Sequence, residues 1–149
     1  GIKSRSGWFM TIYILSFLFM SSLIFPMSKF LTPYKSAYPI ARIIKDYVPA
    51  HEELYQFGMS LYGIDFYSKR RTPVVDDIGE LRPGVEKLPL EEKNRYFLTS
   101  DIFFNLCHEK KDIYCVTERE NVEKLKKKTA FLRILWDNGY YSLVHLKDE

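Results

Sequence analysis

The chain has 149 residues, of which 22 are Lys or Arg and 19 are Asp or Glu, and its formal net charge is +3. All the acidic residues follow an uncharged stretch near the N-terminus, and beyond that stretch bases and acids almost balance. Nucleic acid is therefore not expected as a partner, because the phosphate backbone selects a strongly basic face. The part after the stretch is long enough to bury one core, so we expect one small domain there.

The uncharged stretch extends from Ser6 to Ser28, and its most apolar part is residues 8–25. At a rise of ~1.5 Å per residue, a helix of this length crosses a hydrocarbon core of ~30 Å. A cleaved signal peptide usually has an apolar segment of only ~7–15 residues and a small-residue cleavage site, whereas Pro26 follows here. A buried helix of a soluble domain would normally show a polar face. The sequence therefore predicts a membrane-spanning helix that Pro26 closes.

The flanks of this span suggest an orientation. Lys3 and Arg5 precede it, and an excess of basic residues on one flank marks the cytoplasmic side, although basic residues also follow the span. We expect residues 1–28 to be a transmembrane helix in the cell (inner) membrane and residues 29–149 to be an extracytoplasmic domain. The chain begins with Gly, which suggests the end piece of a longer polypeptide; processing or an expression scar would also explain it.

Residues 36–48 predict an amphipathic helix that Ser36 caps and Pro49 ends. The elements expected after it are, in chain order, a strand at 53–59, a helical turn at 61–67, a strand at 73–75, a long loop at 76–89, a strand at 96–98, a helix from Ser100 or Asp101 to about 108–111, and a strand at 113–116.

Two local signals mark the C-terminal part of the domain. Thr117 and Glu120 have the spacing of a capping box, which predicts a helix from there to about Lys127. Its run of lysines indicates a well-made helix end, with an anionic-lipid patch as the second interpretation. Asp137-Asn138-Gly139 predicts a β-hairpin. The predicted fold class is α/β: one N-terminal transmembrane helix followed by a small layered α/β domain that ends in a β-hairpin.

Motifs for catalysis are absent from the sequence: it has no phosphate-binding glycine loop, nucleophile elbow or paired metal-ligand motif. We therefore expect no catalytic residue, no cofactor and no metal site in this chain. Cys107 and Cys115 lack the spacing and the further ligands of a zinc site. They form either a disulfide, in an oxidising compartment, or two buried thiols. Asp76 and Asp77 are adjacent on a strand end, and so would point to opposite faces.

The best candidate for a binding function is the run Lys69-Arg70-Arg71. Three cations after a short aromatic helix could contact a lipid phosphate or a headgroup, the arginines in fork geometry and the lysine as a point charge. A solvated turn is the alternative interpretation of the same run.

The order of the span, Tyr38-Pro39-Ile40-Ala41 and the segment 58–75 (GMSLYGIDFYSKRRTPVV) resembles the C-terminal part of polytopic glycosyltransferases of the aminoarabinose transferase and protein mannosyltransferase type. Asp101-Ile102-Phe103 and the closing hairpin also fit. The resemblance implies a multi-span membrane body that takes sugar from a polyprenyl-phosphate carrier, and a last span that leads into a small extracytoplasmic α/β domain. In that family the acidic catalytic residues are on the first extracytoplasmic loops of the body, so none can be assigned here.

The resemblance implies that this chain is the accessory, non-catalytic end of a membrane hexosyl- or pentosyltransferase. Its expected partners are membrane lipid, the remaining membrane body of the same enzyme and a polyprenyl-phosphate sugar. The alternative is a single-span membrane-anchored binding or sensing domain without enzymatic activity. An open reading frame that extends upstream through many apolar segments would favour the first hypothesis, and an initiator Met just before Gly1 the second.

Overall fold

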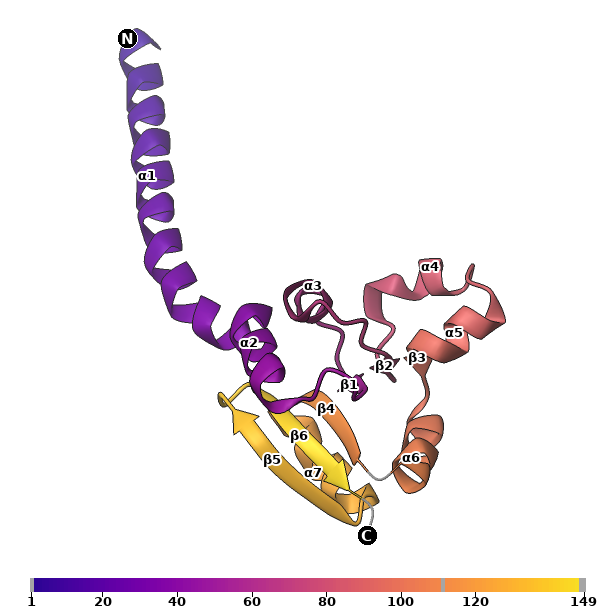
Figure 1. Ribbon diagram of the computed structural model, residues 1–149. Coiled ribbons are helices and arrows are strands. Elements are labelled where there is room, and N and C mark those ends of the chain that lie inside the picture. The colour runs from indigo at the N-terminus through magenta and orange to yellow at the C-terminus, as the bar shows by residue number, and fades with distance from the viewer. Residues whose placement is uncertain (1, 111, 148–149) are drawn as a thin grey trace. The chain divides into compact units, whose positions relative to one another are not determined.

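The computed structural model describes residues 2–110 and 112–147 (Figure 1). The chain forms two compact units, of which the first ends at Tyr34 and the second begins at Lys35. The boundary between them lies a few residues beyond the one expected after residue 28.

The first unit is made by one long helix, α1 (Ile2–Lys35). Its segment Gly7–Phe30 is long and apolar enough to cross a membrane, and none of these 24 residues is buried in the structure. Thr11 donates its hydroxyl to the backbone carbonyl of Gly7 at 2.9 Å, so its polar group is already satisfied within the helix. A membrane-spanning helix thus remains the natural assignment for α1 by its length and composition.

The expectation that Pro26 closes this helix is wrong, since α1 continues through Pro26 and Pro33 to Lys35. A proline removes one backbone hydrogen bond, whereas ending the helix would leave four carbonyls without intrahelical partners. In an apolar surrounding each unsatisfied group is costly, and helices there tolerate a proline.

The second unit contains a six-stranded sheet with the strand order β3-β2-β1-β4-β6-β5. The strands are β1 (Leu54–Phe57), β2 (Val74–Val75), β3 (Phe97–Leu98), β4 (Asp112–Glu118), β5 (Phe131–Asp137) and β6 (Tyr141–Lys147). The first four in this order are mutually parallel, while β6 is antiparallel to both β4 and β5. The predicted fold class is confirmed, including the β-hairpin that ends the domain.

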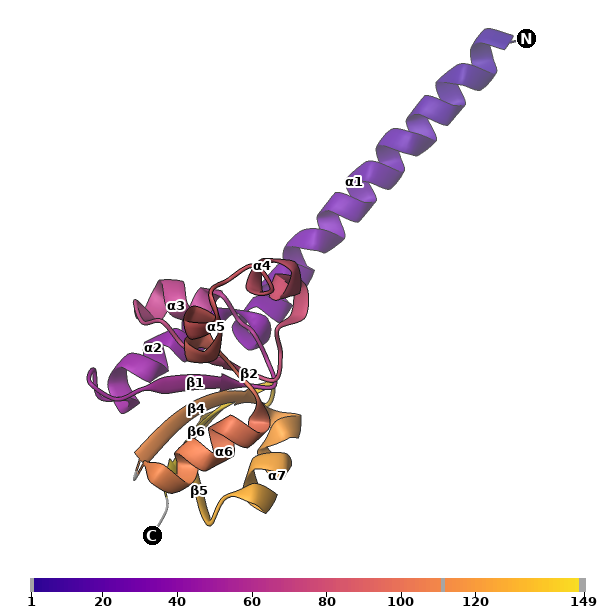
Figure 2. The ribbon, with the colours of Figure 1, turned by 90° about the vertical axis from the view of Figure 1, so that its right-hand side faces the viewer.

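Helices cover both faces of this sheet (Figure 2). The helices α2 (Ala37–Tyr47) and α3 (Gly63–Ser68) pack on one face, and α6 (Ser100–Glu109) and α7 (Arg119–Lys128) on the other. Three further short helices, η1 (Gly79–Leu81), α4 (Arg82–Val85) and α5 (Leu90–Tyr96), connect β2 to β3. The loop expected at residues 76–89 is thus partly helical, because short turns with Pro and Gly lack the apolar periodicity that announces longer helices.

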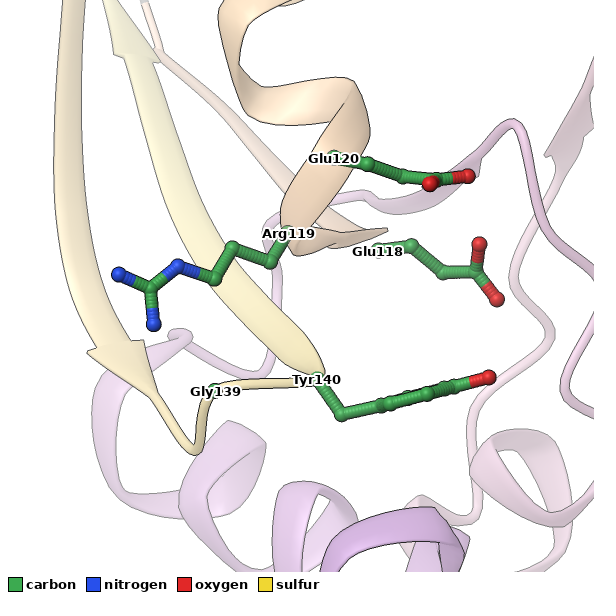
Figure 3. Close-up of a pocket in the computed structure, with 5 residues that line it drawn as sticks. All are labelled: Glu118, Arg119, Glu120, Gly139 and Tyr140. Atoms are coloured by element: carbon green, nitrogen blue, oxygen red, sulfur yellow. The ribbon is translucent and has the colours of Figure 1, made fainter.

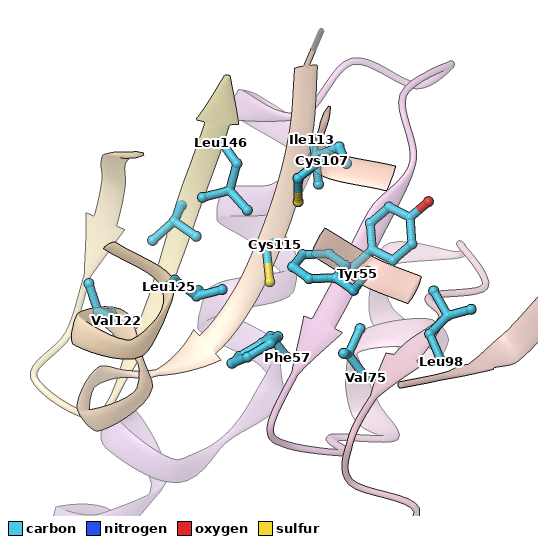
Figure 4. Close-up of a cluster of buried hydrophobic side chains, with 12 residues drawn as sticks. Tyr55, Phe57, Val75, Leu98, Cys107, Ile113, Cys115, Val122, Leu125 and Leu146 are labelled. Carbon is cyan, nitrogen blue, oxygen red and sulfur yellow. The ribbon is translucent and has the colours of Figure 1, made fainter. Parts of the chain in front are cut away.

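Neighbouring residues of the central strands supply two separate hydrophobic cores, since successive side chains in a strand point to opposite faces. Leu54 and Val116 belong to the core under α2 and α3. Tyr55 and Cys115 belong to the core under α6 and α7, where Cys115 is surrounded by aromatic and aliphatic side chains (Figure 4). Burying an Ile, Leu or Phe side chain contributes about 1.5–3 kcal/mol, so both cores are needed to order so small a domain.

One predicted helix cap and the predicted hairpin turn have the expected form. Ser36 is the N-cap of α2, and its hydroxyl accepts a hydrogen bond from the Tyr38 amide at 3.2 Å. In the hairpin turn the side chain of Asn138 accepts from the amides of Tyr140 and Tyr141, and Gly139 has a φ of +86°. Glycine adopts a positive φ without steric cost, and this is why Asn138-Gly139 predicts a turn here.

The starts of α6 and α7 are capped by other residues than those expected. The sequence predicts Ser100 or Asp101 at the start of α6, but the N-cap is Thr99, and Ser100 is held by Asp76. The capping box at Thr117 does not form, because Glu118 is the N-cap of α7 and the Thr117 hydroxyl donates to the carbonyl of Phe57 at 2.9 Å. Thr117 is the buried partner of Phe57 in the β1–β4 pairing, so tertiary contact overrides the local motif.

Candidate functional site

The topology of the sheet singles out the carboxyl ends of β1 and β4. From β1 the chain proceeds outward to β2 and β3, and then returns across β1 to form β4 on its other side. The connections that follow β1 and β4 therefore leave in opposite directions. In open α/β sheets ligands bind in the crevice at such a switch point.

The backbone at this point is tightly constrained. Gly58 follows β1 with a φ of +62°, and a Cβ there would lie 2.9 Å from Nδ2 of Asn121 on α7. A side chain at position 58 would therefore be strained in conformation and would also collide with Asn121. Asn121 is only 5% exposed, and its Oδ1 accepts a hydrogen bond of 2.7 Å from the ammonium of Lys124.

The start of α6 is fastened to the end of β2. Asp76, which has a φ of 64°, accepts hydrogen bonds from both the amide (2.7 Å) and the hydroxyl of Ser100. This pair fixes the first turn of α6 beside the switch point. Asp101 and Phe104 follow on the same helix, and the ring of Phe104 lies 5.9 Å from that of Phe57.

A hollow of 530 Å³ lies between the start of α6 and one side of α7. We call it the α6–α7 hollow, and it is lined by Phe57, Gly58, Asp76, Ser100, Asp101, Phe104, Glu120, Asn121, Lys124, Lys127 and Lys128. Its size falls in the range of small-ligand sites, which is about 300–1,000 Å³. Its lining combines three lysines, three carboxylates and a partly exposed aromatic ring.

A second hollow of 440 Å³ shares Glu120 with the first (Figure 3). Figure 3 shows the carboxylates of Glu118 and Glu120 on one side, while Arg119 extends to the opposite side. Arg119 lies 3.4 Å from Asp137, and the carbonyl of Tyr140 accepts a hydrogen bond from its amide at 2.9 Å. Arg119 thus holds the hairpin turn against α7. In this second hollow its side chain serves the fold.

The predicted run Lys69-Arg70-Arg71 lies at the other edge of the sheet, before β2. Lys69 ends α3 in the left-handed conformation, with a φ of 58°. The guanidinium of Arg70 donates to the carbonyls of Val48 and Pro49, at 2.8 and 3.0 Å. Arg70 therefore neutralises the carbonyl end of α2, an arrangement that the helix dipole favours.

Arg71 has a different set of contacts from Arg70. It donates to the Tyr96 hydroxyl at 3.3 Å and lies over the ring of the same tyrosine at 5.5 Å. Arg70 and Arg71 thus engage different elements, α2 and α5. The structure leaves Lys69 and Arg71 exposed, and a lipid or phosphate contact of the three residues stays a prediction.

Beneath this edge lies a buried polar network that the sequence did not indicate. Gln56 donates to the Thr72 hydroxyl at 2.6 Å, and Thr72 in turn donates its hydroxyl and its amide to Asp65. Burial raises the pKa of Asp65, and its hydrogen bonds from Thr72 oppose that shift. The signal available in the sequence was weak: a glutamine between two aromatic strand residues. The network joins α3 to β1 through Thr72, which lies just before β2.

Cys107 and Cys115 both lie in the core under α6 and α7, as buried thiols (Figure 4). Burial raises the pKa of the Cys115 thiol well above its usual value. Their disulfide stays a prediction for an oxidising compartment. In the described part of the chain, no group of three His, Cys, Asp or Glu side chains is placed to hold a metal ion.

Two solved structures have a fold similar to this chain. Both are of ArnT (aminoarabinose transferase) from Cupriavidus metallidurans, one bound to undecaprenyl phosphate and the other in the apo state. The first has a TM-score of 0.64 and 19% sequence identity, and the match covers 79% of this chain and 21% of ArnT. The second has a TM-score of 0.61 and 19% identity, with 74% and 20% covered.

No protein-family model and no curated protein matches the sequence. The matched region is about a fifth of the length of ArnT. The sequence identity to ArnT is too low to show more than a shared fold. At the level of the fold, the resemblance of this chain to part of an aminoarabinose transferase is confirmed.

Proposed function

We propose that this chain is the C-terminal portion of a membrane glycosyltransferase that transfers a sugar from a polyprenyl-phosphate carrier to an extracytoplasmic acceptor. We assign this portion an accessory, non-catalytic role. The observation that carries the proposal is the fold shared over 79% of the chain with ArnT, in a structure bound to undecaprenyl phosphate. The apolar helix α1 supports it, because a polyprenyl carrier is confined to a membrane.

Deletion of residues 35–149 from the full-length enzyme tests the accessory role. We expect transfer from a polyprenyl-phosphate-linked sugar to fall or disappear, although the catalytic loops of the membrane body remain. Asp65→Asn in the intact enzyme should leave kcat within a few-fold of wild type, since this half-buried acid serves the hydrogen-bond network with Thr72 and Gln56. Unchanged transfer after the deletion would contradict the accessory role, and a thousandfold loss of kcat in a folded Asp65→Asn variant would contradict the non-catalytic one.

The proposal includes an orientation, with residues 29–149 outside the cytoplasm. Its support is the pair Lys3 and Arg5 before the span. Because both native cysteines are buried, a new thiol is needed as a probe, and Glu91→Cys on the exposed side of α5 provides one. We expect an impermeant thiol reagent to label this variant on intact cells. Protection of the site until the cells are lysed would reverse the orientation.

We also propose that Lys69, Arg70 and Arg71 contact a lipid phosphate or headgroup, or the membrane body of the enzyme. The exposed aromatic residue Phe66 lies close by on α3 and suits an interfacial surface. Arg71→Ala is the informative variant, because Arg70 is already committed to the end of α2. Arg71→Ala should raise the KM for the lipid-linked donor several-fold, whereas Lys126→Ala should not. Equal KM values for the two variants would leave the run as a solvated turn.

The α6–α7 hollow favours a second candidate function, a single-span membrane-anchored binding or sensing domain. Residues of β1, α6 and α7, with Gly58 after β1 and Asp76 after β2, line the hollow, and all belong to the second unit, so ligand binding needs no other part of an enzyme. The upstream reading frame separates the two candidates: many apolar segments support the transferase, and an initiator Met directly before Gly1 supports the anchored domain.

A further inference from the structure

The α6–α7 hollow carries charged side chains that the fold does not use in hydrogen bonds or ion pairs. Within residues 2–110 and 112–147, the side chains of Lys127 and Lys128 make no hydrogen bond or ion pair, and the same is true of the side chains of Asp101 and Glu120. By contrast, Lys126, the neighbour of Lys127 on α7, does not line the hollow and pairs with Glu123 at 2.8 Å. Charges of both signs thus line one hollow, with Asp101 and Glu120 in the first turns of α6 and α7 and with Lys127 and Lys128 in the last turn of α7.

One wall of the hollow is already rigid. Asn121 is 5% exposed, and its amide oxygen holds the Lys124 ammonium at 2.7 Å. Its amide nitrogen has no hydrogen-bond acceptor among the described residues, although it borders the hollow beside Gly58. This amide group is therefore available as a donor to an oxygen of a ligand.

These groups specify the chemistry of a ligand. Carboxylates are acceptors only, so Asp101 and Glu120 require hydroxyl or amine donors on the ligand. The lysine ammoniums are donors only and bind phosphate as point charges. The partly exposed ring of Phe104 offers an apolar surface in the lining of the same hollow. A ligand that satisfies all of them has hydroxyls, an anionic group and an apolar ring face.

We propose that the α6–α7 hollow binds a phosphorylated saccharide. Lys127 and Lys128 contact its phosphate, Asp101 and Glu120 accept from its hydroxyl or amino groups, and Asn121 donates to a ring substituent. Phe104 packs against the sugar ring. The binding itself does not depend on glycosyl transfer; only the further step, that such a sugar is the acceptor or the donor headgroup of the enzyme, rests on the proposed function.

Titration of the full chain in nanodiscs with glucosamine 6-phosphate, glucosamine and inorganic phosphate tests the site. We expect glucosamine 6-phosphate to bind at least tenfold more tightly than either of the other two, because each of them engages only part of the lining. Lys127→Ala and Lys128→Ala should each weaken its binding about tenfold, and Asp101→Asn several-fold. The matched control Lys126→Ala, one residue away on the same helix, should bind as wild type does.

Geranyl phosphate tests whether the hollow recognises a phosphorylated saccharide or the phosphate of a lipid carrier. It has the lipid and the phosphate of a donor but no sugar. If geranyl phosphate competes as strongly as glucosamine 6-phosphate does, the hollow binds the lipid carrier and not the saccharide. That result would overturn the proposal. Equal binding of inorganic phosphate, or equal loss in Lys127→Ala and Lys126→Ala, would also overturn it. A failed transfer assay with intact binding would instead count against the proposed function alone.

Discussion

Two clusters of basic residues in this domain look alike in the sequence but are used differently in the structure. In the run Lys69-Arg70-Arg71, the two arginines contact the end of α2 and the ring of Tyr96. In the run at the end of α7, Lys127 and Lys128 line the α6–α7 hollow, and their ammonium groups make no hydrogen bond to any described residue. A cation run in the sequence therefore does not tell how many of its side-chain donors the fold leaves available to a ligand.

The acidic residues at the two edges differ in the same way. Near the amino ends of the parallel strands, Glu53 accepts hydrogen bonds from Lys110, at 2.5 Å, and from the Tyr55 hydroxyl. At the carboxyl ends, Asp101 and Glu120 border the hollow without such partners in the part of the chain that the structure describes. Glu53 thus stabilises the fold, whereas the carboxylates of Asp101 and Glu120 stay available for a ligand.

The largest expected effect on this comparison comes from closing the hollow at its base with Gly58→Ala. The new Cβ would meet Asn121 at 2.9 Å, on a backbone with a φ of +62°. Strain of this kind costs on the order of 1–3 kcal/mol. We expect a clear fall in the midpoint of thermal unfolding and loss of sugar-phosphate binding.

Gly84→Ala is the matched control for this change, because a Cβ there has open space and its φ is not left-handed. It should leave the midpoint within the error of the measurement or raise it slightly, since Ala favours helix. Equal stability of the two variants would show that the contact between β1 and α7 yields easily, and the distinction between a built hollow and an ordinary surface would fail.

The second effect in size separates the two arginines. Arg70→Ala removes two charge-assisted hydrogen bonds to the end of α2, and we expect it to lower the free energy of unfolding by about 1 kcal/mol. Arg71→Ala should leave the thermal midpoint unchanged, because its contacts with Tyr96 are exposed to solvent. Denaturant unfolding of both variants would decide the matter, and a larger loss in Arg71→Ala would reverse their assigned roles.

These variants also show which parts of the structure could be predicted. The cap at Ser36 and the turn at Asn138-Gly139 depend on neighbours in the sequence, and both form as expected. The capping box at Thr117 fails because Thr117 pairs with Phe57, which lies 60 residues away in the chain. The α6–α7 hollow could not be predicted for a similar reason. Gly58, Asp101 and Lys127 are far apart in the sequence, and nothing in their local sequence indicates that the strand order brings them together.

The third prediction concerns pH. Hydrogen bonds from Lys110 and Tyr55 lower the pKa of Glu53 from its ordinary value of 4.5. A carboxyl whose pKa is lowered by folding stabilises the fold above its ordinary pKa, and this stabilisation is lost as the pH falls through the lowered value. The thermal midpoint of Glu53→Gln should therefore be slightly below that of wild type at pH 7 and converge with it as the pH falls through the lowered pKa of Glu53. A constant difference over that range would mean that Glu53 contributes by packing and not by charge.

The smallest expected effect is that of Lys127→Ala combined with Lys128→Ala on stability. Each lysine has a favourable interaction with the negative end of the α7 dipole, worth at most about 0.3–1 kcal/mol and screened by salt. Alanine has the higher helix propensity, and removing two charges also relieves repulsion from Lys124 and Lys126. These terms oppose one another, so we expect the free energy of unfolding to change by less than about 0.5 kcal/mol. Chemical denaturation at low and high salt would measure it. A loss several times larger would show that the fold does use these two lysines, and the contrast with Arg70 on which the binding site depends would no longer hold.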